Sequence, residues 1–205
     1  VPAACFGLAS MYSFHATKVF HTIEGGAVAT QSQALCQKLQ LERNFGITGP
    51  DDVISVGGNA KMNEFQAAMG LCNLRHLSTE IAARRRAHDA YMARLEGLEG
   101  LRLPPVQPGV ESNYAYFPVV FEGGRAVRDA VCEALAAEGV YARKYFYPLI
   151  TDFECYRGRP GFDTRRVPVA RRVSDGVVTL PLYPGLAQED IALICGVVRR
   201  VLSRG

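Results

Sequence analysis

Apolar and polar positions alternate in short runs at the start of this chain. Runs at 11–14 and 26–30 predict two strands, joined by a loop that ends in a Gly-Gly turn. Ser32 is a typical N-cap residue and predicts a helix that extends to about residue 43, where the Asn-Phe-Gly sequence stops it. The first third of the chain is therefore expected to be strand, loop, strand and helix.

Helical spacing dominates the middle of the chain, after a glycine-rich loop over residues 46–60. Apolar residues recur with a helical period from Asn63 past Leu74 and predict a helix there. The residues that carry this period are Phe65, Ala68, Met69, Cys72 and Leu77. A second helical stretch over 79–96 holds three consecutive arginines, which we interpret as a solvated face.

The second half alternates strands and helices after a stretch over 97–109 that holds three prolines and three glycines. Its patterns predict strands at 114–121, 140–145 and 177–180, helices at 125–138 and 188–202, and an irregular segment that contains prolines before the last strand. This alternation indicates a small α/β domain. We therefore expect a domain boundary that divides the chain into residues 1–96 and 97–205.

Composition and charge narrow the classes of function. The chain has 205 residues, a net charge of +3 and 48% hydrophobic residues, so neither nucleic acid nor a membrane is expected as a partner. No apolar run approaches the roughly 18 residues of a membrane span. The six cysteines form no C-x-x-C pair, which favours reduced, mostly buried thiols of a cytoplasmic protein and argues against a disulfide framework or a zinc site.

A single lysine, Lys18, lies in the stretch "SFHATKVFHTIEGGAVAT". Three interpretations of it compete on physical grounds: a solvated surface lysine, a lysine that binds a phosphate, and a lysine that forms a Schiff base with a carbonyl compound. Hydroxyls at Ser13 and Thr17, with backbone amides near the two glycines, could hold an anion such as a cofactor phosphate. Spacing alone does not choose among them.

The amino-acid sequences of several segments resemble those of the DegT/DnrJ/StrS family of pyridoxal-phosphate (PLP)-dependent nucleotide-sugar aminotransferases. The lysine stretch is similar to the family's Ser-Phe-x-x-x-Lys followed by Gly-Gly and a strand. Other matching blocks follow in the family's order: "LERNFGI", "GGNAKMNEFQAAMGLCNL", "SNYAYFPVVF", "YARKYFYPL" and "LPLYPGLAQEDI". The resemblance implies a partial type I PLP-dependent transferase fold of the α/β class, with the end of the large domain and the whole small domain.

The same resemblance implies roles for single residues. Lys18 would form the Schiff base with pyridoxal 5′-phosphate and move protons during the reaction. Ser13 would bind the cofactor phosphate, and Asn59 would reach the phosphate bound by the partner subunit of a homodimer with shared active sites. A turn residue in the left-handed conformation is the alternative for Asn59. His15 and Tyr145 are candidate contacts to the substrate, each weighed against ordinary packing.

Within the family, the segments around His15 and Tyr145 look most like members that aminate a keto group of a dTDP-6-deoxyhexose. Glutamate is the expected amino donor. One departure affects the sugar contacts: many relatives carry a histidine just after the proline at position 148, and this chain has Leu149, Ile150 and Thr151 there. A sugar dehydratase on the same scaffold is the first rival, but such enzymes replace the lysine with histidine.

A non-catalytic regulatory or sensory relative, or a dimerisation module, is the second rival.

The chain starts with Val1 rather than Met, and we expect it to be the C-terminal portion of a longer enzyme. The family's carboxylate partner of the pyridine nitrogen belongs to the upstream region, so the 205-residue chain alone is expected to be inactive.

Overall fold

The computed structural model of the chain describes residues 1–105 and 107–204. These residues form two compact units, Val1–Ser78 and the part of the chain from Thr79 onward. The division between the units falls near the start of a long helix. The boundary expected between residues 96 and 97 separates the large and small domains of the family, which are not the same as these compact units. It therefore stays a prediction.

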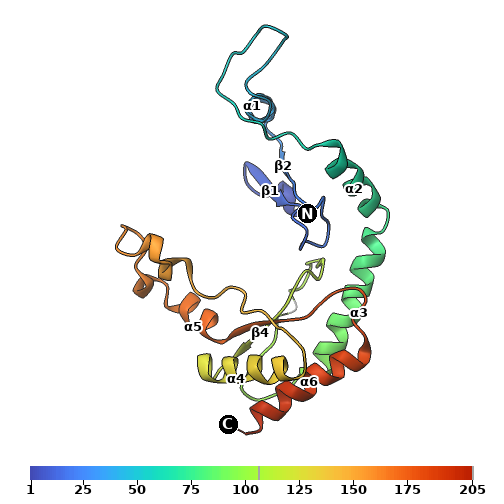
Figure 1. The fold of residues 1–205 in the computed structure, drawn as a ribbon, viewed down its shortest axis with the longest axis vertical. Coiled ribbons are helices and arrows are strands. Elements are labelled where there is room, and N and C mark those ends of the chain that lie inside the picture. The colour runs from blue at the N-terminus through green and yellow to red at the C-terminus, as the bar shows by residue number, and fades with distance from the viewer. Residues whose placement is uncertain (106, 205) are drawn as a thin grey trace. The chain divides into compact units, whose positions relative to one another are not determined.

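The first unit contains a two-stranded antiparallel sheet and two helices (Figure 1). After a 3-10 turn, η1 (Ala3–Cys5), strand β1 (Ala9–Ser13) pairs with β2 (Gly26–Thr30), with Ser13 opposite Gly26. The two strands confirm the prediction from the apolar runs, although β1 begins and ends earlier than expected. The loop that joins them carries Lys18.

Local capping fixes the two helices of this unit. Helix α1 (Gln33–Arg43) begins where Ser32 accepts a hydrogen bond from the backbone N–H of Leu35 at 3.2 Å. Helix α2 (Glu64–Leu74) begins with a capping box, in which Asn63 and Gln66 each accept a backbone N–H bond from the other. Both helices were predicted with nearly these bounds, because caps and periodicity agree.

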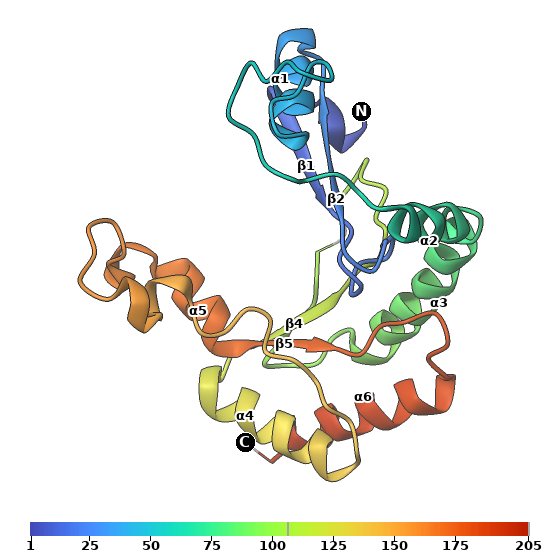
Figure 2. The ribbon, with the colours of Figure 1, turned by 45° about the horizontal axis from the view of Figure 1, so that its top comes forward.

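The second unit is a three-stranded antiparallel sheet with helices packed against it. Its strands are β3 (Leu101–Arg102), β4 (Phe117–Phe121) and β5 (Val177–Leu180), in the order β3-β4-β5. Figure 2 shows β4 and β5 side by side, with α4 (Gly124–Ala137) and α6 (Gln188–Leu202) beside each other near the sheet. The remaining elements are α3 (Leu77–Leu95), α5 (Pro168–Gly176) and the 3-10 turns η2 (Ile150–Asp152), η3 (Glu154–Tyr156) and η4 (Thr164–Arg166).

The core of the second unit gathers around alternate residues of β4. Phe117, Val119 and Phe121 are buried, as the period of two in a strand requires for one face. The ring of Tyr91 in α3 stacks on Phe117 with centroids 4.8 Å apart, and its hydroxyl donates to the carbonyl oxygen of Pro181 at 3.0 Å. Helix α6 adds a buried apolar face made of Ile191, Ile194, Cys195, Val197 and Val198.

Three expectations for the second unit were wrong. Residues 140–145 form no strand, because only Arg143 bridges to Thr179 before the chain turns at Lys144. The strand expected from residue 114 begins at Phe117, since Tyr114 has a φ of 51° and its N–H donates to the Ser112 hydroxyl. The segment expected to be irregular contains α5, whose Pro168 lies in the first turn, where proline is tolerated.

The cysteine expectation was half right. All six are free thiols, but only Cys195 is buried, while Cys5, Cys72 and Cys155 are exposed and Cys36 and Cys132 are intermediate. In the described ranges, no helix is both long and apolar enough to cross a membrane.

Candidate functional site

The loop between β1 and β2 holds Lys18 in a closed ring of backbone hydrogen bonds. At its base the N–H of Phe14 donates to the carbonyl oxygen of Gly25 at 2.9 Å, and the N–H of Thr22 donates to the carbonyl of Phe14 at 2.9 Å. Inside the ring the Lys18 N–H donates to His15 at 2.9 Å, forming a tight turn. The lysine is therefore presented on a short, internally bonded loop.

The Lys18 side chain is half-buried, and its amine has no hydrogen bond or ion pair within residues 1–105 and 107–204. An amine without a carboxylate partner is available to a ligand. This distinguishes Lys18 from Lys38 and Lys144, which pair with Glu42 and Asp129, respectively.

Two other predicted residues lie at the start of the same loop: Ser13 is the last residue of β1, and His15 is the second residue of the loop. The hydroxyl of Ser13 accepts a long hydrogen bond from the N–H of His15 at 3.5 Å. The imidazole of His15 contacts the Thr17 hydroxyl at 3.0 Å and lies 3.5 Å from the Glu24 carboxylate. Ser13 thus ends β1, and His15 and Lys18 lie on the loop that follows it, while their roles toward a cofactor or substrate stay predictions.

A buried threonine that the sequence analysis did not single out organises this loop. Thr22 is 2% exposed, and its hydroxyl donates to the carbonyl oxygen of Glu24 at 2.7 Å. A Cβ on Gly25, where φ is 155°, would lie 2.2 Å from that hydroxyl, so the first glycine of the Gly-Gly turn leaves room for the threonine. A threonine three residues before a Gly-Gly turn was the available signal.

Asn59 belongs to the Gly-Gly-Asn stretch at residues 57–59, which is joined to the end of α1 by backbone hydrogen bonds. The N–H of Gly58 donates to Glu42 at 2.8 Å, and the N–H of Phe45 donates to Gly58 at 3.0 Å. We call residues 42–46 with 57–60 the α1 clip. In the clip Phe45 has the left-handed φ of 57°, whereas Asn59 is not among the positive-φ residues, so the turn alternative for Asn59 was wrong.

The Asn59 side chain contacts a neighbouring lysine. Its carbonyl oxygen Oδ1 accepts a hydrogen bond from the amine of Lys61 at 2.9 Å, and that amine also lies 4.2 Å from the centre of the Phe45 ring. Within the described residues, no hydrogen bond or ion pair joins Asn59 to the Lys18 loop of the same chain. The prediction that Asn59 reaches a neighbouring subunit's cofactor stays a prediction.

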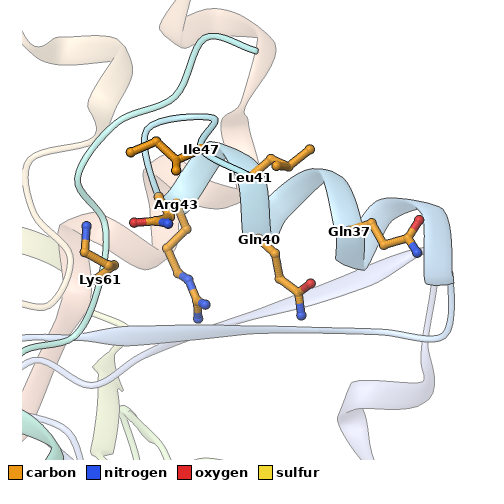
Figure 3. A pocket seen from close by; sticks show the side chains of 7 residues that line it. Gln37, Gln40, Leu41, Arg43, Ile47 and Lys61 are labelled. Carbon is orange, nitrogen blue, oxygen red and sulfur yellow. The ribbon is translucent and has the colours of Figure 1, made fainter. Parts of the chain in front are cut away.

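A hollow of about 560 Å³ lies beside the clip (Figure 3). Figure 3 shows Gln40 and Arg43 extending to the same side of α1, with Lys61, the residue that follows the clip, nearby. Gln37, Leu41, Asn44 and Ile47 complete its lining. Two cations, three amides and two aliphatic side chains line it, so its surface is of mixed character.

Tyr145, the fifth predicted residue, belongs to the second unit. Its ring stacks on Phe146 with centroids 4.7 Å apart and meets Tyr116 edge-on at 5.9 Å, and its hydroxyl accepts a hydrogen bond from Arg143. The phenol is half-buried, so Tyr145 is neither a core residue nor free in solvent. Its contact to a substrate stays a prediction.

A charged network anchors the segment that contains Tyr145. Arg128 of α4 is 1% exposed and donates to the Ser174 carbonyl at 3.0 Å and to Asp129 at 2.9 Å. Lys144 lies 2.5 Å from the same carboxylate. The hydrogen bonds from Arg128 and then Lys144 lower the pKa of Asp129 to about 2.

The residues on the Lys18 loop have the chemistry that pyridoxal phosphate requires. A primary amine without a partner can condense with an aldehyde, and the Ser13 hydroxyl at the end of β1 can donate to a phosphate. Lys18 and Ser13 are therefore the residues of this chain that fit the cofactor. In the described part of the chain no group of histidine, cysteine and acidic residues could hold a metal ion.

Solved structures define the class of this fold. The chain superposes on DesI, crystallised in the presence of its TDP-sugar product, with a TM-score of 0.89 and 36% identity over 100% of this chain and 52% of DesI. It also superposes on PseC, an aminotransferase of Helicobacter pylori, with a TM-score of 0.86 and 26% identity, covering 98% of this chain and 54% of PseC. The fold is part of a type I PLP-dependent aminotransferase.

Residues 2–199 match the DegT/DnrJ/EryC1/StrS aminotransferase family, and the chain belongs to that family. Its aminotransferases are PLP-dependent. The resemblance drawn from the sequence blocks and the expected fold class are both confirmed.

Curated relatives carry more specific names. A dTDP-4-amino-4,6-dideoxy-D-glucose transaminase of Shigella dysenteriae is 33% identical over 94% of this chain and 52% of the relative. One of the same name from Escherichia coli is 35% identical over 83% of this chain and 46% of the relative. The chain spans about half the length of the curated relatives it matches.

Proposed function

We propose that the whole protein is a nucleotide-sugar aminotransferase in which Lys18 binds pyridoxal phosphate. The observation that carries the proposal is the half-buried Lys18, whose amine has no partner in the described residues and which lies on the closed loop that begins directly after Ser13. A lysine that served only solubility would need neither the closed ring nor the buried Thr22.

The residues of this chain would divide the work as follows. Pyridoxal phosphate, when bound, supplies the aldehyde and the electron sink for amine exchange. Ser13 would orient the cofactor by donating a hydrogen bond to its phosphate. Lys18 would hold and release a proton at Nζ, a task that its freedom from any carboxylate favours. His15 and Tyr145 would contact the substrate.

The proposed substrate is a dTDP-linked 6-deoxyhexose with a keto group, and the proposed amino donor is glutamate. Two relatives at 33% and 35% identity are dTDP-4-amino-4,6-dideoxy-D-glucose transaminases, and DesI was crystallised with a TDP-sugar product. These names support the substrate class. A comparison of turnover with dTDP- and UDP-linked keto sugars would test it.

We propose further that the protein is a cytoplasmic homodimer in which Asn59 completes the partner's site. The six free cysteines fit a reducing compartment. The exposed position of Asn59 fits a residue that acts outside its own unit. An N59A variant of the whole protein should then lose cofactor affinity, which titration of pyridoxal phosphate would measure.

The decisive experiment traps the cofactor on the full-length protein with borohydride and maps the adduct by peptide mass spectrometry. We expect a pyridoxyl group on Lys18, and none in a K18R variant. A K38R variant is the matched control, because Lys38 is an exposed lysine paired with Glu42. An adduct absent from Lys18 in the wild-type protein would overturn the proposal and favour a regulatory or dimerisation role.

The 205-residue chain alone is proposed to be inactive. The family's partner for the pyridine nitrogen is expected upstream of the matched region, so the chain should lack the group that stabilises negative charge on the cofactor ring. Assays of the purified chain and of the full-length protein at equal concentration would compare them. Turnover by the chain alone would refute this part of the proposal.

A further inference from the structure

We propose that Gly70 of α2 is a positioning residue for Lys18 and that it acts through Thr22. This inference rests on the proposed role of Lys18 in binding pyridoxal phosphate. It assigns a function to a helix that supplies no group to the reaction itself.

The first observation is how tightly Thr22 is fixed. Its N–H donates to the carbonyl oxygen of Phe14 at 2.9 Å, and its hydroxyl donates to Glu24 at 2.7 Å. Its carbonyl oxygen accepts from the N–H of Glu24 at 2.9 Å. All three polar groups of Thr22 are thus used within the loop, and only the methyl group Cγ2 remains for an outside contact. Since Thr22 is 2% exposed, that methyl group is covered by protein.

The second observation is what covers the methyl group. Gly70 is the buried residue of α2, and a Cβ built on it would lie 2.9 Å from the Thr22 methyl carbon and 3.6 Å from the Phe20 ring. Carbon atoms in ordinary contact stay about 3.5–4.0 Å apart, so only glycine permits this approach. The helix backbone therefore defines how far the Thr22 side of the loop can move.

A second tether joins the same helix to the same loop, one turn further on. The Asn73 amide donates to the carbonyl oxygen of His21 at 2.9 Å, and its nitrogen lies 3.4 Å from the His21 ring nitrogen Nε2. Two successive loop residues, His21 and Thr22, thus contact residues of α2 that lie three positions apart. Residues at this spacing share one helix face, so the loop docks on a defined surface.

The position of Lys18 depends on the contact between Thr22 and α2 because the loop is closed by hydrogen bonds. The Phe14–Gly25 and Thr22–Phe14 bonds tie both ends of the loop together, and the rings of Phe14 and Phe20 meet edge-on at 4.9 Å. A displacement of Thr22 away from α2 would therefore carry the Lys18 turn with it. A misplacement of about 1 Å at a reacting group can cost about a hundredfold in rate, so such a displacement would change how fast the Lys18 amine reacts.

The test uses the full-length protein with three variants: G70A, T22S and the double variant G70A/T22S. G70A adds the methyl group that collides with Thr22, whereas T22S removes the colliding Cγ2 but keeps the hydroxyl bond to Glu24. The double variant should therefore relieve the collision. G196A is the matched control, because Gly196 is also inside a helix and a Cβ there has no atom within 4 Å.

Two readouts follow Lys18 itself. The first is the rate of pyridoxyl adduct formation at Lys18 under limiting cofactor and borohydride. The second is the rate of acetylation of Lys18 by acetic anhydride without cofactor, measured by peptide mass spectrometry. We expect G70A to change both rates by about fivefold or more, and the double variant to return to within about twofold of T22S.

The outcomes separate the inference from the proposed function. If Lys18 forms no adduct in the wild type but its acetylation still responds to G70A and recovers in the double variant, the cofactor role fails and the positioning role stands. If both rates in G70A equal those of G196A, the positioning role is overturned. A loss in G70A that T22S does not relieve, with a lower melting temperature, also overturns it.

Discussion

The guanidinium carbon of Arg128 lies 4.1 Å from the centre of the Tyr147 ring. Arg128 itself is only 1% exposed. The arginine of α4 thereby holds the segment that carries Tyr145, through ring contact and through its bond to Ser174. The Ser174 hydroxyl in turn donates to the carbonyl oxygen of Phe146 at 3.1 Å. The segment that carries Tyr145, a candidate substrate contact, is thus held in place by the buried guanidinium of Arg128.

Replacing Arg128 with methionine should destabilise the second unit. The change leaves the Ser174 carbonyl and part of the Asp129 carboxylate without their donor, and such losses typically cost about 1–3 kcal/mol. Urea denaturation of wild type and R128M would measure the free energy of unfolding. R172M is the control, since Arg172 is exposed on α5, and an equal loss in both variants would contradict the prediction.

The stability of the protein should depend on pH through Asp129. The pKa of this carboxyl is lowered to about 2 in the folded state, below the roughly 3.9 of an unperturbed aspartate. Its contribution to stability is therefore present above about pH 4 and is lost as the pH falls toward 2. D129N should be less stable than wild type at pH 6, with the difference shrinking toward pH 2.

Urea midpoints at several pH values between 2 and 6 would test this dependence. E99Q is the matched control, because Glu99 is an exposed carboxylate of the same unit. A difference between D129N and wild type that stays constant over this range would argue against the assigned pKa.

A G57A substitution should open the α1 clip. A Cβ on Gly57 would lie 2.5 Å from the Gly46 nitrogen and 2.8 Å from the Phe45 carbonyl carbon, both backbone atoms that cannot rotate away. The bonds from Gly58 to Glu42 and from Ala60 to Arg43 should then weaken. Hydrogen exchange at the amides of Gly58 and Ala60 should accelerate by about tenfold, which corresponds to about 1.4 kcal/mol.

The neighbouring residue supplies the control for that experiment. A Cβ on Gly58 meets nothing within 4 Å, so G58A should leave exchange at Ala60 unchanged. Equal acceleration in both variants would show that the clip responds to loss of glycine in general rather than to the collision at Gly57.

Cysteine reactivity should separate Cys155 from Cys195. Cys155 is exposed, whereas burial raises the pKa of the Cys195 thiol to about 11. At pH 8 a disulfide reagent should therefore modify Cys155 rapidly and leave Cys195 unmodified until the protein is unfolded in denaturant. Peptide mass spectrometry after timed quenching would follow both sites, and rapid modification of native Cys195 would disprove its burial.

Helices α1, α2 and α6 and strand β5 could be predicted because local signals and burial agree for them. Ser32 and Asn63 cap their helices with side-chain oxygens, and the apolar period of α6 matches its buried face. Local chemistry determined these bounds, so the sequence was sufficient.

The failures arose where tertiary context decides. The β-branched and aromatic pattern of residues 140–145 favours a strand, but only Arg143 finds a backbone partner, at Thr179. The Lys18 loop could be found from its motif, whereas its docking on Gly70 and Asn73 could not. That docking joins residues about 50 positions apart in the sequence. Local periodicity cannot predict a contact between residues so far apart.

The pairing of β4 with β5 places Phe117 opposite Leu180 and therefore closes a loop of about 60 residues. Helix α4 lies within that loop and contacts both strands, so it can form early and guide them together. Until β5 arrives, Phe117, Val119 and Phe121 have no complete cover. The second unit should therefore fold more slowly than a helical bundle of its size, and its greatest risk of aggregation falls in the interval before the sheet closes.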